Sequence, residues 1–378
     1  MVKTLCLLLF IMSGVGYSQY SNDDNNRYLV GERYEQSGYP EKAKEIYEDL
    51  YRRDSSNPQY FSSLNRIYVL LKQYDSSVKL LEARLSTNPQ DINLYGLLGS
   101  TYYLMGNETK AYSTWEDGLK KQPQSQFNYQ LMANYAIERR DFEKAIDFLK
   151  RGKKISDNPL IFSFDLANLY SLTMRYKDAA EEYLFIVLKN PEQYQGVQSR
   201  LLSYISKVDA LQTTIDVFEK KRDEDNINMS KLLASLYIQG KMYEKAYGIY
   251  SEIDSKLKSK GLELFNFAQT LYNEQEYELG AKVYQDIIKR YPSSPVISNA
   301  KLGYAETLEA NIGKESETSW KPFSFNKTGD PQKVNEIITT YSEIVKLYPQ
   351  TEPANEALLR IGILKTTKLN DQDGAKET

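Results

Sequence analysis

Residues 95–123 read YGLLGSTYYLMGNETKAYSTWEDGLKKQP, and this stretch contains the pattern that decides the fold. Spacings of three, four and seven residues place side chains on one stripe of a helix, and this stripe collects Tyr95, Leu98, Gly99 and Tyr102. Gly106 and Asn107 predict a turn, after which Ala111 and Trp115 lie four residues apart on a second helix. Pro123 ends the unit because a helix cannot continue through it. The stretch therefore predicts two paired helices joined by a tight turn.

The same order of small and large residues recurs every 34 positions. An aromatic series is formed by Tyr34, Tyr68, Tyr102, Ala136, Tyr170 and Tyr204. Two series of small residues are Gly31, Asn65, Gly99, Ala133, Ala167 and Ala43, Ser77, Ala111, Ala145, Ala179. A bulky series is Tyr47, Leu81, Trp115, Leu149 and Tyr183. A period of this length indicates an all-α helical repeat protein in which each unit packs on its neighbours.

These residues give the chain a resemblance to the tetratricopeptide repeat (TPR) family. The family pattern is matched at Leu166-Ala167-x-x-Tyr170, at Leu233-Ala234-x-x-Tyr237, and at Phe267-Ala268 followed by Tyr277, Gly280, Tyr284 and Pro292. The resemblance covers roughly residues 24–365 and implies a right-handed superhelical solenoid of about ten helix-turn-helix repeats, degenerate ones included. It also implies that the chain binds a protein or peptide and has no enzymatic activity.

The repeat pattern divides the chain into segments. We expect five regular repeats over 24–193, a degenerate repeat over 194–226, and two further repeats over 227–295. Leu201 and Thr213 replace the small residues in the degenerate unit. We expect one repeat over 296–353 with an inserted loop at 311–330, and a partial repeat or closing helix over 354–378.

Residues 1–18 have the character of a secretory signal peptide. Lys3 supplies the positive start, and Leu5 to Met12 form an apolar run. This run is too short to cross a bilayer, which needs about 20 residues. Cys6 is the only cysteine and precedes most of the run, which argues against a lipid anchor. We expect secretion across an inner membrane, a periplasmic location with outer-membrane association left open, and no membrane span.

Composition excludes several classes of function. The chain has 48 basic and 51 acidic residues, so it lacks the positive charge that attracts nucleic acid. It contains no histidine, which removes most hydrolase triads and zinc sites. Paired carboxylates such as Glu181 and Glu182 are interpreted as surface charge. We therefore expect no catalytic residue, no metal site and no cofactor.

The linkers of the last units resemble those of bacterial envelope repeat proteins. They are Tyr291-Pro292-Ser293-Ser294-Pro295 followed by Ala300-Lys301-Leu302-Gly303, and Tyr348-Pro349-Gln350-Thr351 followed by Ala357 to Gly362. This subgroup includes the periplasmic partner of the Tol-Pal system and the outer-membrane assembly lipoprotein. The missing anchor cysteine argues against the second. The resemblance supports an envelope-associated partner.

The candidate binding residues lie on a second stripe of each first helix. The position directly after the small residue is polar in seven units, at Glu32, Arg66, Ser100, Asn134, Asn168, Ser235 and Gln269. Aromatic residues that could anchor a partner are nearby: Tyr28, Tyr103, Phe164, Phe265 and Tyr272. The simpler interpretation is that an exposed groove must be polar. Some cytosolic TPR proteins bind carboxylate tails through basic groups, but Gln130 and Asp165 stand at those places, so we do not expect that function.

A second candidate is the inserted loop, where Trp320, Phe323 and Phe325 either pack against the repeats or dock a partner. The sequence thus favours a non-enzymatic exported scaffold that binds a protein through its concave groove. Two alternatives remain open. The first alternative is that the chain is the recognition arm of a longer envelope enzyme or signalling protein. The second alternative is a glycan-binding module that uses Tyr103 or Tyr272.

Overall fold

The computed structural model describes residues 23–206, 208–318 and 330–378. All regular structure in these ranges is helical, which confirms the predicted all-α class. The chain divides into two compact units, Met1–Leu169 and Tyr170–Thr378. The expected signal peptide at 1–18 lies outside the described residues.

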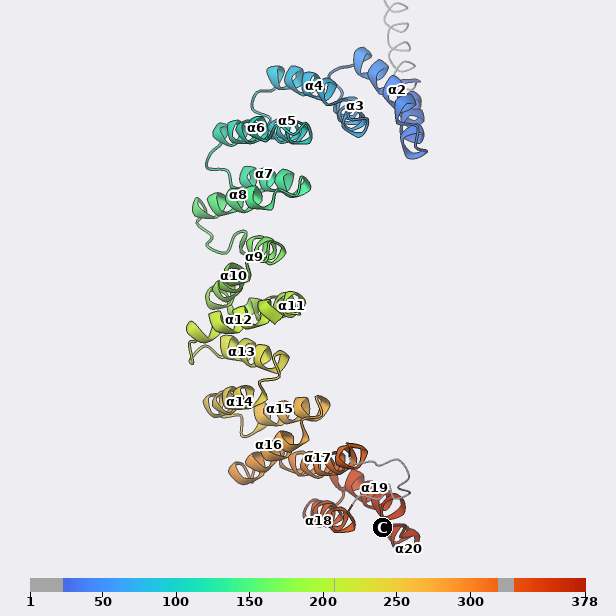
Figure 1. Ribbon diagram of the computed structural model, residues 1–378, viewed down its shortest axis with the longest axis vertical. Helices are drawn as coiled ribbons and strands as arrows, with labels where there is room; N and C mark the ends of the chain where they lie inside the picture. The colour runs from blue at the N-terminus through green and yellow to red at the C-terminus, as the bar shows by residue number, and fades with distance from the viewer. Residues whose placement is uncertain (1–22, 207, 319–329) are drawn as a thin grey trace, which may run out of the picture. The chain divides into compact units, whose positions relative to one another are not determined.

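In the first unit, each helix from α2 to α7 packs on the next one along the chain (Figure 1). Helical residues 23–36 come first and contact the second helix through Gly31, against which the Tyr47 ring lies. The following helices are α2 (Pro40–Arg53), α3 (Pro58–Leu70), α4 (Tyr74–Thr87), α5 (Ile92–Leu104), α6 (Glu108–Lys121), α7 (Gln126–Glu138) and α8 (Phe142–Lys154). α9 (Ser163–Leu172) contains the division between the units.

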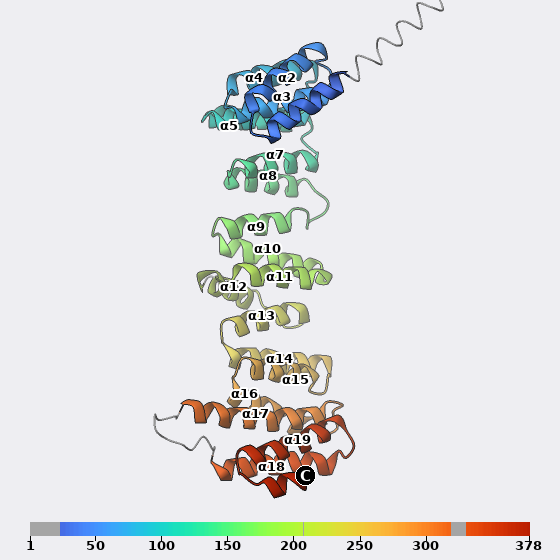
Figure 2. The ribbon, with the colours of Figure 1, turned by 90° about the vertical axis from the view of Figure 1, so that its right-hand side faces the viewer.

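The second unit continues with helices packed in the same manner (Figure 2). Its elements are α10 (Tyr176–Lys189), the 3-10 turn η1 (Pro191–Gln193), α11 (Tyr194–Tyr204), α12 (Val208–Lys220), α13 (Ile227–Gln239), α14 (Tyr243–Leu257), α15 (Leu262–Asn273), α16 (Tyr277–Arg290), α17 (Ile297–Thr318), α18 (Pro331–Leu347), α19 (Glu352–Thr367) and α20 (Gln372–Lys376).

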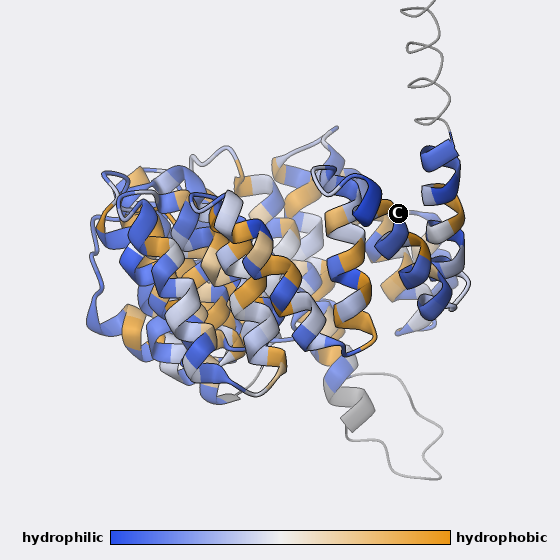
Figure 3. Cartoon of the chain, turned by 90° about the horizontal axis from the view of Figure 1, so that it is seen from above, coloured by the Kyte–Doolittle hydropathy of each residue, from blue (hydrophilic) through white to orange (hydrophobic). Residues whose placement is uncertain are grey.

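Close packing of small against bulky residues holds each helix pair together. A Cβ atom on Gly99 would lie 2.3 Å from Nε1 of Trp115, so only glycine fits beneath this indole. The indole nitrogen donates a 3.0 Å hydrogen bond to the carbonyl oxygen of Gly96. Apolar and polar residues alternate along the helices, as two-sided helices require (Figure 3). The small and bulky series read from the sequence therefore mark the buried contact.

The turn inside each repeat has a fixed backbone geometry. The residue two positions before the second helix has a left-handed φ, and this position recurs at Gly38, Lys72, Gly106, Arg140, Met174, Lys241 and Gln275. The next amide donates to the carbonyl five residues earlier, as from Asn107 to Tyr102 at 2.9 Å. Glycine is present in only some of these turns, so hydrogen bonding to the first helix, rather than residue type, sets the conformation.

Tyrosines of the aromatic series also tie one repeat to the preceding one. The Tyr68 hydroxyl donates to Glu48 at 2.9 Å, and the Tyr102 hydroxyl donates to Glu82 at 2.9 Å. Both carboxylates lie on the second helix of the preceding repeat. Burial and the Glu82 carboxylate raise the pKa of Tyr102 to about 12. The aromatic series thus contributes polar contacts as well as apolar packing.

The degenerate repeat and the ninth repeat depart from the regular arrangement. α12 packs on α10 and α13, and Tyr204 of α11 stacks on Tyr183 with ring centroids 5.8 Å apart. The loop expected at 311–330 begins later than predicted, because α17 continues to Thr318. Leu308 and Ile312 lie four residues apart and pack on the core formed with α18 and α19, which explains the longer helix.

Candidate functional site

In the first unit, the polar stripe is used mainly for contacts within the chain. Arg66 forms a two-pronged ion pair with Glu35 of the preceding repeat, at 2.7 Å from Nε to Oε1 and 2.8 Å from Nη2 to Oε2. The pKa of the Glu35 carboxyl is lowered mainly by this hydrogen bond. Arg66 stays 53% exposed, so a partner can reach it, but only in competition with Glu35.

Ser100 lies in a different environment from the one predicted. Its side chain is 6% exposed, and its hydroxyl has no hydrogen-bond partner among the described residues. α5 packs on both α6 and α7, and the residues from Leu98 to Tyr102 are all buried. Ser100 is therefore not on an accessible groove surface.

The remaining first-unit candidates divide into two kinds. Asn134 and Asn168 are exposed, as the stripe predicted. Tyr103 is half-buried and stacks on Trp115, with ring centroids 6.2 Å apart and planes 22° apart. Tyr112 lies against the same indole at 6.0 Å. Tyr103 thus belongs to the aromatic packing of its repeat.

Ser235 is held within the second unit in a similar way. Its hydroxyl accepts a 3.1 Å hydrogen bond from Gln198 of α11 and donates a 3.0 Å bond to the carbonyl of Lys231. The side chain is half-buried. Its main contribution here is to link α11 with α13.

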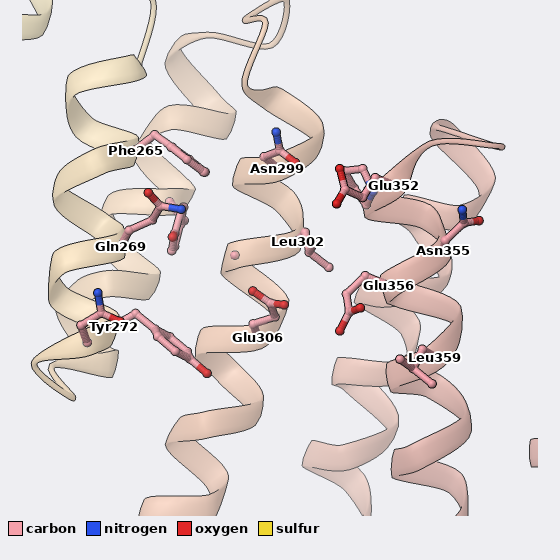
Figure 4. A pocket seen from close by; sticks show the side chains of 14 residues that line it. Phe265, Gln269, Tyr272, Asn299, Leu302, Glu306, Glu352, Asn355, Glu356 and Leu359 are labelled. Carbon is pink, nitrogen blue, oxygen red and sulfur yellow. The ribbon is translucent and has the colours of Figure 1, made fainter.

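Gln269 and Tyr272, in contrast, line an open pocket of about 830 Å³ (Figure 4). The pocket lies between α15, α17 and α19, which are the first helices of three successive repeats. Phe265, one of the predicted aromatic anchors, lies one turn before Gln269 on the same helix and lines the same space. The structure therefore brings together three of the sequence-predicted residues.

Carboxylates form the second component of this pocket. They are Glu306 of α17 and Glu352 and Glu356 of α19. No lysine or arginine is among the residues that line the pocket in the described chain. Arg360 is not among the lining residues, and it pairs with Glu356 at 3.1 Å and with Glu309 at 3.6 Å. The lining itself is therefore acidic.

Glu306 differs from its neighbours because it has no hydrogen-bond or ion-pair partner among the described residues, although it is half-buried. Burial raises the pKa of its carboxyl, Arg360 lowers it, and Glu356 and Glu309 raise it further. A partly desolvated carboxylate without a partner is unfavourable unless a cation approaches it.

Aromatic and amide side chains complete the lining. Phe265 meets Tyr284 edge to face, with centroids 5.9 Å apart, and Tyr272 meets Tyr277 in the same way at 5.6 Å. Gln269, Asn299 and Asn355 supply amide groups, which can both donate and accept hydrogen bonds. The pocket thus combines negative charge, aromatic faces and backbone-binding groups.

Sequence reasoning missed the residues that α17 and α19 contribute. The predicted stripe used one position per helix, directly after the small residue. The α17 residues lie on the other side of the helix from the predicted stripe. Relative to Gly303, they stand four residues before it (Asn299), one residue before it (Leu302) and three residues after it (Glu306). A prediction that included the positions on both sides of the small residue in each first helix would have found them.

Other candidate sites are less developed. Trp320, Phe323 and Phe325 lie outside the described residues. Within the described ranges, the side chains form no group of three or more metal-ligating residues. None of the described helices combines the length and apolar character that a bilayer span requires. The pocket in the second unit is therefore the best-defined candidate site.

Comparison with known proteins identifies one of the repeats that line this pocket. Residues 264–294, which hold nearly all of α15 and α16, match the model of the tetratricopeptide repeat family. The match assigns this one helix pair to the tetratricopeptide repeat family. The helix pairs of both units have the corresponding helix-turn-helix form, and the predicted TPR fold is confirmed.

Two solved structures to which the chain is similar are the following. A thermophilic TPR protein of Thermus thermophilus is 18% identical over 48% of this chain and 98% of that chain, with a TM-score of 0.31. MamA from Desulfovibrio magneticus is 16% identical over 45% of this chain and 96% of that chain, with a TM-score of 0.31. No curated protein matches the sequence.

Proposed function

We propose that this TPR protein is an exported, non-enzymatic scaffold of the bacterial envelope that binds a protein partner along the groove formed by the first helices of its repeats. TPR proteins are generally non-catalytic and bind other proteins, and this general role follows from the fold. The single observation that supports use of the groove is the open pocket lined by Gln269 and Tyr272. The repeat register predicts Gln269 as a groove residue and Tyr272 as a nearby aromatic anchor.

The mechanism of this proposal is the display of fixed side chains. α15, α17 and α19 hold their side chains on rigid, packed helices, so binding does not require the surface to become ordered. A flexible partner segment would supply most of the conformational change. Affinity then depends on how well the segment matches the pocket, as expected for a binding surface with a few dominant residues.

A photo-crosslinking experiment in intact cells tests groove binding. A crosslinking amino acid replaces Gln269, which is exposed in the pocket, and in a matched variant replaces Lys289, which is exposed on α16 outside it. The proposal expects one partner to crosslink from position 269 and not from position 289. Equal crosslinking from both positions, or from neither, contradicts it.

Export rests on residues 1–18 and needs its own test. A reporter that becomes active only after crossing the inner membrane is fused to these residues, with a matched fusion in which two leucines of the apolar run, Leu7 and Leu8, are changed to arginine. The proposal expects activity from the first fusion alone. Activity retained by the arginine variant, or absent from both fusions, contradicts an exported location.

A further inference from the structure

We propose that the pocket between α15, α17 and α19 receives a lysine or arginine side chain from the partner protein. This inference rests on the proposed groove binding and names the chemistry of its central contact. Three observations carry it, namely the charge of the lining, the position of Glu306, and the aromatic wall.

Charge complementarity selects a cation. Glu306, Glu352 and Glu356 line the pocket, and no basic residue of the described chain joins them in the lining. Arg360, the nearest guanidinium, is held by Glu356 and Glu309. Its single positive charge is shared by those two carboxylates, and Glu306 forms no ion pair with any partner in the described structure. An incoming cation would supply that partner.

The position of Glu306 makes its carboxylate the group that would contact the cation. Figure 4 shows its carboxylate between the helix that carries Gln269 and Tyr272 and the helix that carries Glu352 and Glu356. A group that enters between α15 and α19 therefore passes over this carboxylate. Because the site is partly desolvated, the attraction there is stronger than at an exposed carboxylate.

The aromatic wall suits the alkyl stem and the charged end of a basic side chain. Phe265, Tyr272 and Tyr284 line the side of the pocket formed by α15 and α16. Aromatic faces attract ammonium and guanidinium groups, and they also cover the methylene groups that precede them. This chain already makes such pairs itself, for example Lys110 over Tyr102 at 4.9 Å.

The size of the pocket and its amide groups point to a peptide rather than a free ion. A volume of about 830 Å³ exceeds what one side chain fills and falls in the range of ligand sites. Gln269, Asn299 and Asn355 can hydrogen-bond the peptide backbone on either side of the basic residue. The occupant is thus a short peptide segment centred on lysine or arginine.

Isothermal titration of the full chain with capped pentapeptides tests this inference. The probes are alanine peptides with lysine, arginine, norleucine or glutamate at the centre. We expect the lysine and arginine peptides to bind at least about tenfold more tightly than the norleucine peptide. The difference should shrink as salt is raised. Equal binding of the basic and norleucine peptides overturns the inference.

Two variants locate the contact. Glu306→Gln should reduce the affinity for the basic peptides by about tenfold or more and leave the norleucine peptide unchanged. Glu343→Gln, an exposed carboxylate on α18 outside the pocket, is the matched control and should change neither. An unchanged affinity in Glu306→Gln overturns the inference. Should that variant fail to fold, Glu352→Gln decides in the same way, because Glu352 also lines the pocket and is exposed.

The outcome is separable from that of the groove proposal. If position 269 crosslinks to a partner whose binding is unaffected by Glu306→Gln and by excess lysine peptide, the groove is used but its pocket does not read a basic residue. If no groove position crosslinks, the groove proposal itself fails. Loss of partner binding in Glu306→Gln, together with competition by the lysine peptide, supports both.

Discussion

The ring of Tyr135 on α7 occupies the space where a side chain on Gly96 of α5 would stand. A Cβ atom on Gly96 would lie 2.0 Å from the Tyr135 ring, and the Tyr135 hydroxyl donates to Asn93 one turn earlier on α5. The space between these two first helices is therefore filled by the tyrosine ring. The corresponding space between α15 and α17 in the second unit is open and forms part of the pocket.

This contact makes a quantitative prediction for stability. Gly96→Ala should destabilise the first unit by about 1 to 3 kcal/mol, because the tyrosine ring must move. Tyr135→Ala removes the obstacle, so the double variant should lose less stability than the two single losses added together. Urea denaturation of all four proteins measures the coupling. Additive losses would show that the two residues do not interact.

Trp115 should contribute strongly to the first unit. It is fully buried and contacts Tyr103, Tyr112 and Phe148. Trp115→Ala should cost about 3 to 5 kcal/mol. The loss should appear as faster hydrogen exchange in α5 to α8, because repeats stabilise mainly their neighbours. Phe127→Ala, at a side chain that is 69% exposed, is the control and should change stability by less than about 0.5 kcal/mol.

The left-handed turns predict opposite effects of glycine and alanine. Arg140 has φ 62° and is exposed, so Arg140→Gly should stabilise the chain by about 1 kcal/mol through relief of backbone strain. Gly106 has φ 76° with open space around its Cβ position, so Gly106→Ala should destabilise it by a similar amount. Chemical denaturation measures both. A loss of stability in Arg140→Gly would mean that its side chain matters more than its backbone.

The Arg66–Glu35 pair should add a modest, pH-dependent stability. Its guanidinium is more than half exposed, so Arg66→Ala should cost less than about 1 kcal/mol at pH 7. Folding lowers the pKa of Glu35, so this contribution is present above the unfolded value and is lost as the pH falls through the folded value. Denaturation of both proteins over a series of decreasing pH tests this, and the difference in stability should shrink as the pH falls. A difference that is independent of pH contradicts an ionic origin.

The ionised carboxylate of Glu306 should have the opposite effect on stability from that of Glu35. Folding raises the pKa of its carboxyl, so the folded chain binds this proton more tightly than the unfolded chain does. The ionised carboxylate therefore disfavours folding above that pKa, and Glu306→Gln should be at least as stable as the natural chain at pH 7. The advantage should disappear as the pH falls below about 4.5, where both states bind the proton.

Several other titratable groups face Glu306 and contribute to the pH dependence of stability. Denaturation of the natural chain and of Glu306→Gln over a range of pH values measures their combined effect. Arg360 and Glu356 lie on α19, and Glu309 lies on the same helix as Glu306. Burial raises the pKa of Tyr272, Tyr284 and Tyr341, so these hydroxyls stay neutral near pH 7. A Glu306→Gln variant that is less stable than the natural chain at pH 7 would show that Arg360 stabilises the carboxylate more than burial penalises it.

The sequence predicted part of this site and missed the rest for identifiable reasons. Gln269 and Tyr272 were found because they keep a fixed spacing from Ala268 within one helix. Glu356 was missed because, like Asn299 on α17, it lies one residue before the alanine of its helix and outside the predicted stripe. Ser100 was placed on the accessible surface because its register matches that of Gln269, whereas α7 packs on α5 and buries it.

What the sequence by itself determined is the pairing of helices. Gly99 and Trp115 must meet because the turn between them is short and their helices are adjacent, so a local period suffices. Only the tertiary structure decided whether the space between the first helices of successive repeats is open or filled by side chains. That outcome depends on side chains from helices far apart in the chain, such as Tyr135 against Gly96 or Glu306 beside Tyr272, whose separation is set by the packing of every helix between them.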